Sequence, residues 1–203
     1  MTSVWRGRHL PTTFGVFCLA FLFAFESLAV ATVMPEIAAD LDGLSLYAVA
    51  FAAPMAGQVL GLTVAGPWID RRGPGPAITL GVAVFAVGSL GCGVAPSMLP
   101  FLLGRLLQGL GAGGYSVGLY VVVAQAYPES LRPRAFTVLA AAWVLPALVG
   151  PVLAATVADL LGWRWVFVAV PVLGLAAWLL VRRAAAGGGG GDAPLSRATA
   201  VGA

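Results

Sequence analysis

The hydrophobic positions of this chain gather into six long apolar runs separated by short polar connections. Each run holds about 20 mostly apolar residues, which is the length that a helix needs to cross the hydrocarbon core of a bilayer. The connections are rich in proline, glycine and charged residues, as is typical of turns. The runs span residues 13–34, 46–66, 77–95, 98–124, 136–158 and 163–181. The pattern therefore predicts an all-α membrane protein with six transmembrane helices.

The composition supports lipid as the surroundings of this chain. Hydrophobic residues make up 60% and charged residues 9% of the sequence, and the mean hydropathy is +0.97. A soluble domain carries about 25% charged residues. We expect residues 1–12 to form a cytoplasmic N-terminal segment, 13–183 the six-helix transmembrane bundle, and 184–203 a Gly-rich flexible cytoplasmic tail. Glu26 interrupts the first run and five more runs follow, so this run is predicted to be a helix rather than a signal peptide.

The placement of arginine predicts the orientation. All eleven cationic side chains are arginines, and pairs of them fall at every second connection or terminus. Arginine marks the cytoplasmic side of a membrane protein, so both termini are predicted to be cytoplasmic. The absence of lysine and asparagine, with abundant alanine and glycine, suggests a GC-rich bacterial genome and therefore a bacterial inner (plasma) membrane. Scattered arginine pairs fit this role better than nucleic-acid binding, and we expect no nucleic-acid partner. The pairs are Arg6 and Arg8, Arg71 and Arg72, Arg132 and Arg134, and Arg182 and Arg183.

The stretch GPWIDRRGPG, residues 66–75, holds one acid, two arginines, three glycines and two prolines. We expect Gly66 and Pro67 to end one helix, and the glycines and prolines from Gly73 to Pro76 to hold a tight turn. Asp70-x-x-Gly73 recurs as Asp159-x-x-Gly162 after the fifth run. Three helices are an odd number, so the two sets would face opposite ways. This predicts a 3+3 inverted repeat.

Two motifs stand in the second connection and the fourth run. Gly66, Asp70, Arg71 and Gly73 match the loop motif G-x-x-x-D-R-x-G-R-[KR], although Pro74 and Gly75 replace its final basic pair. In the fourth run, Arg105, Gln108 and Gly109 match R-x-x-Q-G. With these motifs the chain resembles the major facilitator superfamily.

Three other stretches extend the resemblance. Gly150 and Pro151 match the antiporter motif G-P-x-x-G-G, with Ala154 and Ala155 where glycines are usual. The first run resembles the acid-bearing first helix of proton-coupled drug exporters, with Glu26 as the acid. The stretch from Pro128 to Ala135, which contains Arg132, is similar to the family's connection after helix four.

The resemblance covers about residues 12–183, which correspond to the N-terminal half of a usual twelve- or fourteen-helix member. It implies half of a major facilitator fold and proton-coupled export, by antiport, of small organic or drug-like compounds. It also implies that Gly66, Asp70, Arg71, Gly73 and Arg132 belong to a cytoplasmic gate loop. The bend expected at Gly150–Pro151 would seal the cavity against proton leakage.

Glu26 and Arg105 are the charges that lie most clearly inside predicted spans. At 1.5 Å per residue they lie about 12 Å and about 10 Å from the same side of the membrane. Charges at such depth are costly and usually face the interior of a bundle or a cavity. We expect Glu26 to be the proton-coupling acid and Arg105 its partner, with Gln108 and Tyr115 lining a substrate cavity. The alternative is a static buried pair that fixes helix packing.

Other classes of protein have less support. Gly114 to Gly118 fits G-x-S-x-G, but an intramembrane serine protease needs a base, and His9, the only histidine, lies outside the bundle. Cys18 and Cys92 have no metal-binding spacing. We therefore expect no enzyme activity, no cofactor and no metal. A channel is also possible, although the repeat and the bent fifth helix favour a carrier.

The expected partners are the lipid bilayer, a small organic substrate and protons. A major facilitator carrier binds its substrate between two six-helix halves, and this chain provides one. A second copy or a C-terminal half-transporter would complete the site. The remaining alternative is a truncated or half-size fragment that does not transport alone.

Overall fold

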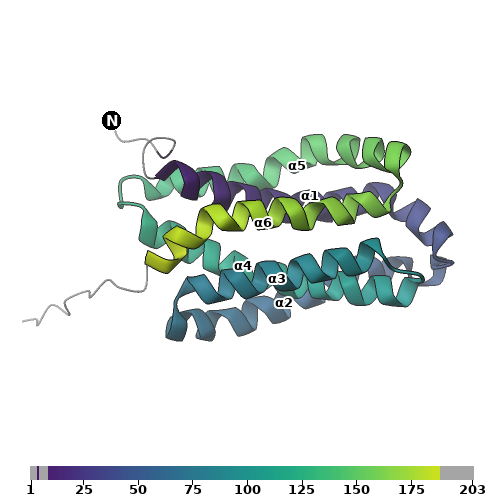
Figure 1. The fold of residues 1–203 in the computed structure, drawn as a ribbon, viewed down its shortest axis with the longest axis horizontal. Coiled ribbons are helices and arrows are strands. Elements are labelled where there is room, and N and C mark those ends of the chain that lie inside the picture. The colour runs from purple at the N-terminus through teal and green to yellow at the C-terminus, as the bar shows by residue number, and fades with distance from the viewer. Residues whose placement is uncertain (1–3, 5–8, 188–203) are drawn as a thin grey trace, which may run out of the picture.

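The computed structural model describes Val4 and residues 9–187, and it arranges six helices side by side as a bundle (Figure 1). All six are long and apolar enough to cross a membrane. They confirm the predicted all-α membrane fold with six spans. The helices are α1 (Leu10–Asp40), α2 (Tyr47–Arg72), α3 (Pro74–Gly93), α4 (Met98–Ala126), α5 (Arg132–Leu161) and α6 (Arg164–Gly187), and a short 3₁₀ turn, η2 (Leu44–Leu46), precedes α2.

Two helices continue past the prolines that follow the predicted apolar runs. Pro35 lies inside α1, and Gly66 and Pro67 lie inside α2, which continues to Arg72. The prediction that Gly66 and Pro67 end a helix is therefore wrong. Interior proline is tolerated in membrane helices because neighbouring groups satisfy the carbonyl that it frees. Of the stretch 66–75, only Gly73 is non-helical, because α3 already begins at Pro74. Arg6, Arg8 and the tail from residue 188 lie outside the described residues.

Gly73 and Gly162 end α2 and α5 in the same unusual conformation. Their φ and ψ angles are 76° and 172° at Gly73, and 91° and 153° at Gly162. This region is essentially restricted to glycine. Each backbone N–H donates to the carbonyl four residues earlier, at 2.8 Å in both cases. The match between the two Asp-x-x-Gly segments in the sequence is therefore also a match in backbone structure.

The packing of the helices follows the inverted repeat. If α1, α2 and α3 correspond to α4, α5 and α6, the α1–α5 contact corresponds to the α2–α4 contact, and both are extensive. The α3–α4 and α1–α6 contacts correspond in the same way, and α3 packs directly on α6. The bundle is therefore a 3+3 inverted repeat.

Glycines let α4 approach α2 and α3 closely. A Cβ atom at Gly109 would lie against the Pro54 backbone, and one at Gly113 would lie against the Gln58 carbonyl, both on α2. On the α3 side, a Cβ atom at Gly111 would lie against the backbone of Phe85. Because lipid provides no hydrophobic drive between helices, small residues and close packing hold them together. The glycine-rich fourth span is thus explained by packing on both sides.

The charged residues divide between the two ends of the bundle. Six arginines lie where α2, α4 and α6 end and α3 and α5 begin: Arg71, Arg72, Arg132, Arg134, Arg182 and Arg183. We call this the arginine-rich end (Figure 1). Asp40, Asp42, Asp159 and Arg164 lie at the opposite end. This distribution of the arginines agrees with the prediction that the arginine pairs fall at one side of the membrane. The assignment of the arginine-rich end to the cytoplasm stays a prediction.

Replacing either capping glycine should destabilise the fold. Gly73→Ala or Gly162→Ala places a side chain at a positive φ, where we expect a cost of about 1–3 kcal/mol although a Cβ atom would meet nothing within 4 Å at either position. The midpoint of thermal unfolding in detergent, followed by circular dichroism, should fall. Gly66→Ala is the matched control, since Gly66 is helical and also has open space around it. Equal midpoints for all three variants would contradict this account.

Adding a methyl group between α4 and α2 should also lower stability. Gly113→Ala forces the added carbon toward the Gln58 carbonyl, and overpacking costs about 1–3 kcal/mol. Gly174→Ala on α6 is the control, because a Cβ atom there meets nothing within 4 Å. The same thermal measurement checks this prediction, and a Gly113→Ala midpoint at or above that of the control would contradict it.

Candidate functional site

A cluster of buried polar side chains lies inside the bundle where α1, α3 and α4 meet. Glu26 comes from α1, Ser89 and Cys92 from α3, and Arg105 and Gln108 from α4. Glu26, Ser89, Arg105 and Gln108 are 1%, 0%, 3% and 1% exposed. Polar groups at this depth must find partners within the protein.

Local helix geometry and glycine packing bring these groups together. Ser89 and Cys92 are three residues apart on α3, as Arg105 and Gln108 are on α4, so each pair shares one helix face. The two faces approach closely because Gly88 lies against the Gln108 backbone. The polar cluster therefore depends on the same small residues that pack α4.

Glu26 receives its hydrogen bonds on one oxygen only. Its Oε1 accepts a bond from the Ser89 hydroxyl at 2.8 Å and another from the Gln108 side-chain amide. Its Oε2 is buried and has no hydrogen-bond partner among the described residues. A carboxyl oxygen without a partner in such surroundings is costly for the charged form of the group.

Gln108 connects Glu26 to Arg105. The Arg105 Nη1 donates to the Gln108 Oε1 at 2.9 Å, while the Gln108 Nε2 donates to Glu26. The Arg105 Nε also donates to the Ala50 carbonyl of α2 at 3.4 Å. No ion pair joins Glu26 and Arg105 in the described part of the chain. The structure thus brings the two predicted charges into one cluster, with an amide between them rather than in direct contact.

Ser89 is the member that sequence reasoning missed. Its hydroxyl oxygen lies 2.8 Å from the Glu26 Oε1 and 2.8 Å from the Phe167 carbonyl of α6. A lone serine in an apolar span is a weak signal, because serine also occurs at membrane helix contacts for packing alone. Only its position opposite Glu26 distinguishes it.

The other predicted site residues lie apart from this cluster. Tyr115 is 2% exposed and donates to the Leu19 carbonyl at 3.3 Å. Gly150 faces α1, where a Cβ atom would lie 3.7 Å from the Phe25 ring. Pro151 lies within a continuous α5. A substrate cavity lined by Gln108 and Tyr115, and a bend at Gly150–Pro151, stay predictions.

The residues assigned to a gate loop lie at the arginine-rich end, but most of them are helical. Asp70 and Arg71 are exposed residues of the last turn of α2, and Arg132 is the first residue of α5. The Arg132 Nε donates to the Tyr127 carbonyl at 3.2 Å, and its Nη1 lies 3.7 Å from the Glu129 carboxylate. Both of these side-chain contacts of Arg132 lie within the connection between α4 and α5.

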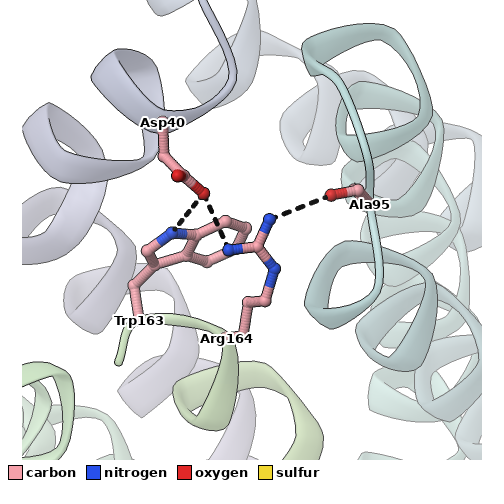
Figure 2. A network of polar contacts seen from close by, with 4 residues as sticks. All are labelled: Asp40, Ala95, Trp163 and Arg164. Carbon is pink, nitrogen blue, oxygen red and sulfur yellow. Dashed lines mark hydrogen bonds and ion pairs between the residues drawn. The ribbon is translucent and has the colours of Figure 1, made fainter. Parts of the chain in front are cut away.

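A second polar network lies at the opposite end of the bundle (Figure 2). The Asp40 Oδ2 at the end of α1 accepts from Arg164 at 2.7 Å and from the Trp163 indole at 3.2 Å. Arg164 also donates to the Ala95 carbonyl at 3.4 Å, and its guanidinium lies over the Trp163 ring. These contacts join the start of α6 to α1 and to the α3–α4 connection.

Among the residues that the structure describes, no basic side chain forms a hydrogen bond with the serine of the G-x-S-x-G segment. The Ser116 hydroxyl donates to the Gly113 carbonyl of its own helix at 3.0 Å. His9 stacks on Tyr127, which follows the last residue of α4 and lies about 16 Å from Ser116 along the helix axis at 1.5 Å per residue. The geometry thus gives the serine-protease alternative no support.

Comparison with known proteins identifies the family. The Major Facilitator Superfamily pattern matches residues 16–200, so the chain belongs to this family of transporters. A protein named probable multidrug-efflux transporter, from Mycobacterium tuberculosis, is 34% identical over 170 residues, which cover 82% of this chain and 36% of that protein. Multidrug resistance protein 3 of Bacillus subtilis is 29% identical over 160 residues, covering 78% and 31%. The chain spans about a third of the length of these relatives.

The fold matches half of a solved transporter. The proton:xylose symporter XylE bound to 6-bromo-6-deoxy-D-glucose superposes with a TM-score of 0.76 at 15% identity, covering 85% of this chain and 44% of that one. An inward-open structure of XylE from E. coli gives 0.71 at 18% identity, covering 84% and 47%. At these identities the likeness concerns the fold, and it confirms that the bundle is half of a major facilitator fold.

Removing the Gln108 amide should destabilise the bundle. Gln108→Leu leaves Arg105 without one acceptor and Glu26 without one donor, and unsatisfied buried groups cost about 1–3 kcal/mol each. Gln125→Leu is the matched control on the same helix, because Gln125 is exposed. Thermal unfolding in detergent should show a lower midpoint for Gln108→Leu alone. A midpoint equal to that of the control would show that the amide bridge contributes nothing to stability.

Proposed function

We propose that this chain forms half of a secondary active transporter that exports small organic compounds in exchange for protons. The observation that carries the proposal is the buried Glu26 carboxyl, with hydrogen-bond donors on one oxygen and no partner on the other. A membrane-embedded acid held in this way is suited to bind and release a proton, because the donors on one oxygen favour the charged form while the burial of the unpartnered oxygen favours the neutral form.

The Ser89 contacts can serve both protonation states of Glu26. A hydroxyl has one hydrogen and two acceptor lone pairs. When Glu26 is charged, Ser89 donates to its Oε1. When that oxygen carries a proton, it can donate to the Ser89 Oγ, while Ser89 donates to the Phe167 carbonyl, which lies at the same distance of 2.8 Å. Glu26 can therefore gain or lose a proton while its Oε1 and the Ser89 Oγ keep their positions.

Arg105 acts on Glu26 through Gln108. Its positive charge favours a charged carboxyl nearby, and the bridging amide fixes how close the two groups come. A substrate or helix movement that breaks the bridge would change the balance between the two forms of Glu26. In this proposal Gln108 and Tyr115 contribute to the substrate cavity, and the alternative role of the cluster is static packing.

The relatives support the substrate class. Two of them carry names that refer to multidrug efflux or multidrug resistance, which agrees with a small organic or drug-like cargo. In major facilitator carriers the substrate site lies near the bilayer midplane between the repeats. We place the arginine-rich end, with the gate residues Asp70, Arg71 and Arg132, in the cytoplasm of a bacterial cell.

A half-size unit that needs a second half is the other candidate. The lengths of the matched proteins favour this candidate, because the match covers only 36% of the M. tuberculosis relative and 44% of the XylE chain. Native mass spectrometry of the purified chain in a lipid nanodisc distinguishes the possibilities. A defined dimer supports a site closed by two copies. A monomer supports a requirement for a C-terminal half-transporter.

Glu26→Gln should abolish proton coupling. The amide keeps the size of the side chain but cannot exchange a proton at neutral pH. Substrate-induced proton release should be measured by a fluorescent pH probe in proteoliposomes that contain the complete assembly. Glu36→Gln is the matched control, because Glu36 is an exposed acid on the same helix. We expect the signal to fall to background for Glu26→Gln and to remain with Glu36→Gln. Normal coupling in both variants would favour the static buried pair.

A further inference from the structure

A groove at the arginine-rich end lies outside the site described above. It has a volume of about 590 Å³ and lies between the end of α2, the first turns of α3 and the last turns of α6. Arg72 and Arg182 both line it, and none of its lining residues is acidic. Asp70 lines a different pocket, which also includes Arg72.

Arg182 of α6 is positioned by contacts that involve Trp178 and Thr79. The Trp178 indole donates to the Thr79 hydroxyl of α3 at 3.0 Å, which fixes the ring against that helix. The Arg182 guanidinium lies over this ring, 5.2 Å from its centre. Arg72, the last residue of α2, also lines the groove. In the described part of the chain, no ion pair occupies either guanidinium.

The remaining wall of the groove is apolar and runs toward the middle of the membrane. Leu80 and Ala83 line it, and Ala83 lies about 15 Å along the helix axis from Gly73 at 1.5 Å per residue. The groove therefore changes from cationic at the membrane surface to apolar within the bilayer. Tryptophan is typical of this interfacial depth.

We infer that this groove binds one anionic phospholipid, with the phosphate between Arg72 and Arg182 and an acyl chain along α3. Charge complementarity selects a lipid with a net negative headgroup, and the apolar wall selects a lipid over a soluble phosphate. Basic pockets between membrane helices bind anionic headgroups in this way. Because the lipid would contact α2, α3 and α6 together, it would stabilise the junction of the two three-helix repeats at this end.

Native mass spectrometry of the full chain, released from mixed phosphatidylglycerol and phosphatidylcholine, tests the inference. We expect one retained phosphatidylglycerol in preference to phosphatidylcholine. The double variant Arg72→Gln/Arg182→Gln should bind it about 30-fold more weakly, from the usual contribution of two interfacial arginines. Arg134→Gln is the matched control, because Arg134 is an exposed arginine at the same end but outside the groove. Arg182→Gln alone, at an exposed helix end, should weaken retention several-fold and serves if the double variant does not fold.

Three results would overturn the inference. Equal retention by the double variant and Arg134→Gln would mean that the charge of the whole end attracts the lipid. Equal retention of both lipids by the unaltered chain would remove the selectivity for an anionic headgroup. Displacement of phosphatidylglycerol by excess glycerol phosphate would assign the arginines to a soluble phosphate instead.

Discussion

The close approach of α4 to α2 and α3 is the constraint on which the rest of this structure depends. Glycines of α4 lie directly against the backbones of both neighbours, and no larger residue would fit. In lipid this shape complementarity, rather than hydrophobic burial, holds the helices together. It also decides which polar side chains meet, because Gln108 reaches Glu26 across the contact between Gly88 and α4. The glycines that allow the helices to pack closely therefore also bring the polar side chains of the candidate site together.

The inverted repeat gives the bundle two related ends with different chemistry. Gly73 and Gly162 close α2 and α5 in the same way. Beyond these caps the two ends diverge. After Gly162, Trp163 and Arg164 form a polar network with Asp40 (Figure 2). After Gly73, prolines start α3 at once, and Arg72 is left facing a groove. At the end that contains Gly162, polar side chains bind to one another and connect helices of the bundle. At the arginine-rich end, Arg72 and Arg182 face a groove instead.

Helix number, approximate span positions and the end at which each arginine lies could be predicted from the sequence, because each depends on local composition. The family motifs also placed Glu26, Arg105 and Gln108 among the candidates. The residues at which α1 and α2 end, Asp40 and Arg72, could not be predicted in the same way, because both helices continue past Pro35 and Pro67. A proline is a reliable helix terminator in water, but inside lipid the helix continues, because no water is present to satisfy an interrupted backbone.

The sequence by itself determined that this is a six-span membrane protein, which charges lie at membrane depth, and that an Asp-x-x-Gly segment recurs at the corresponding place in each repeat. Only the tertiary structure decided that Gln108 stands between Glu26 and Arg105, that Ser89 contacts the acid, and that Arg72 and Arg182 share a groove. The physical reason is that a membrane helix is apolar on its lipid face and on its packed face alike. Hydrophobic periodicity therefore does not reveal which side of a helix faces its neighbours, and the partners of each polar group emerge only when the helices are packed.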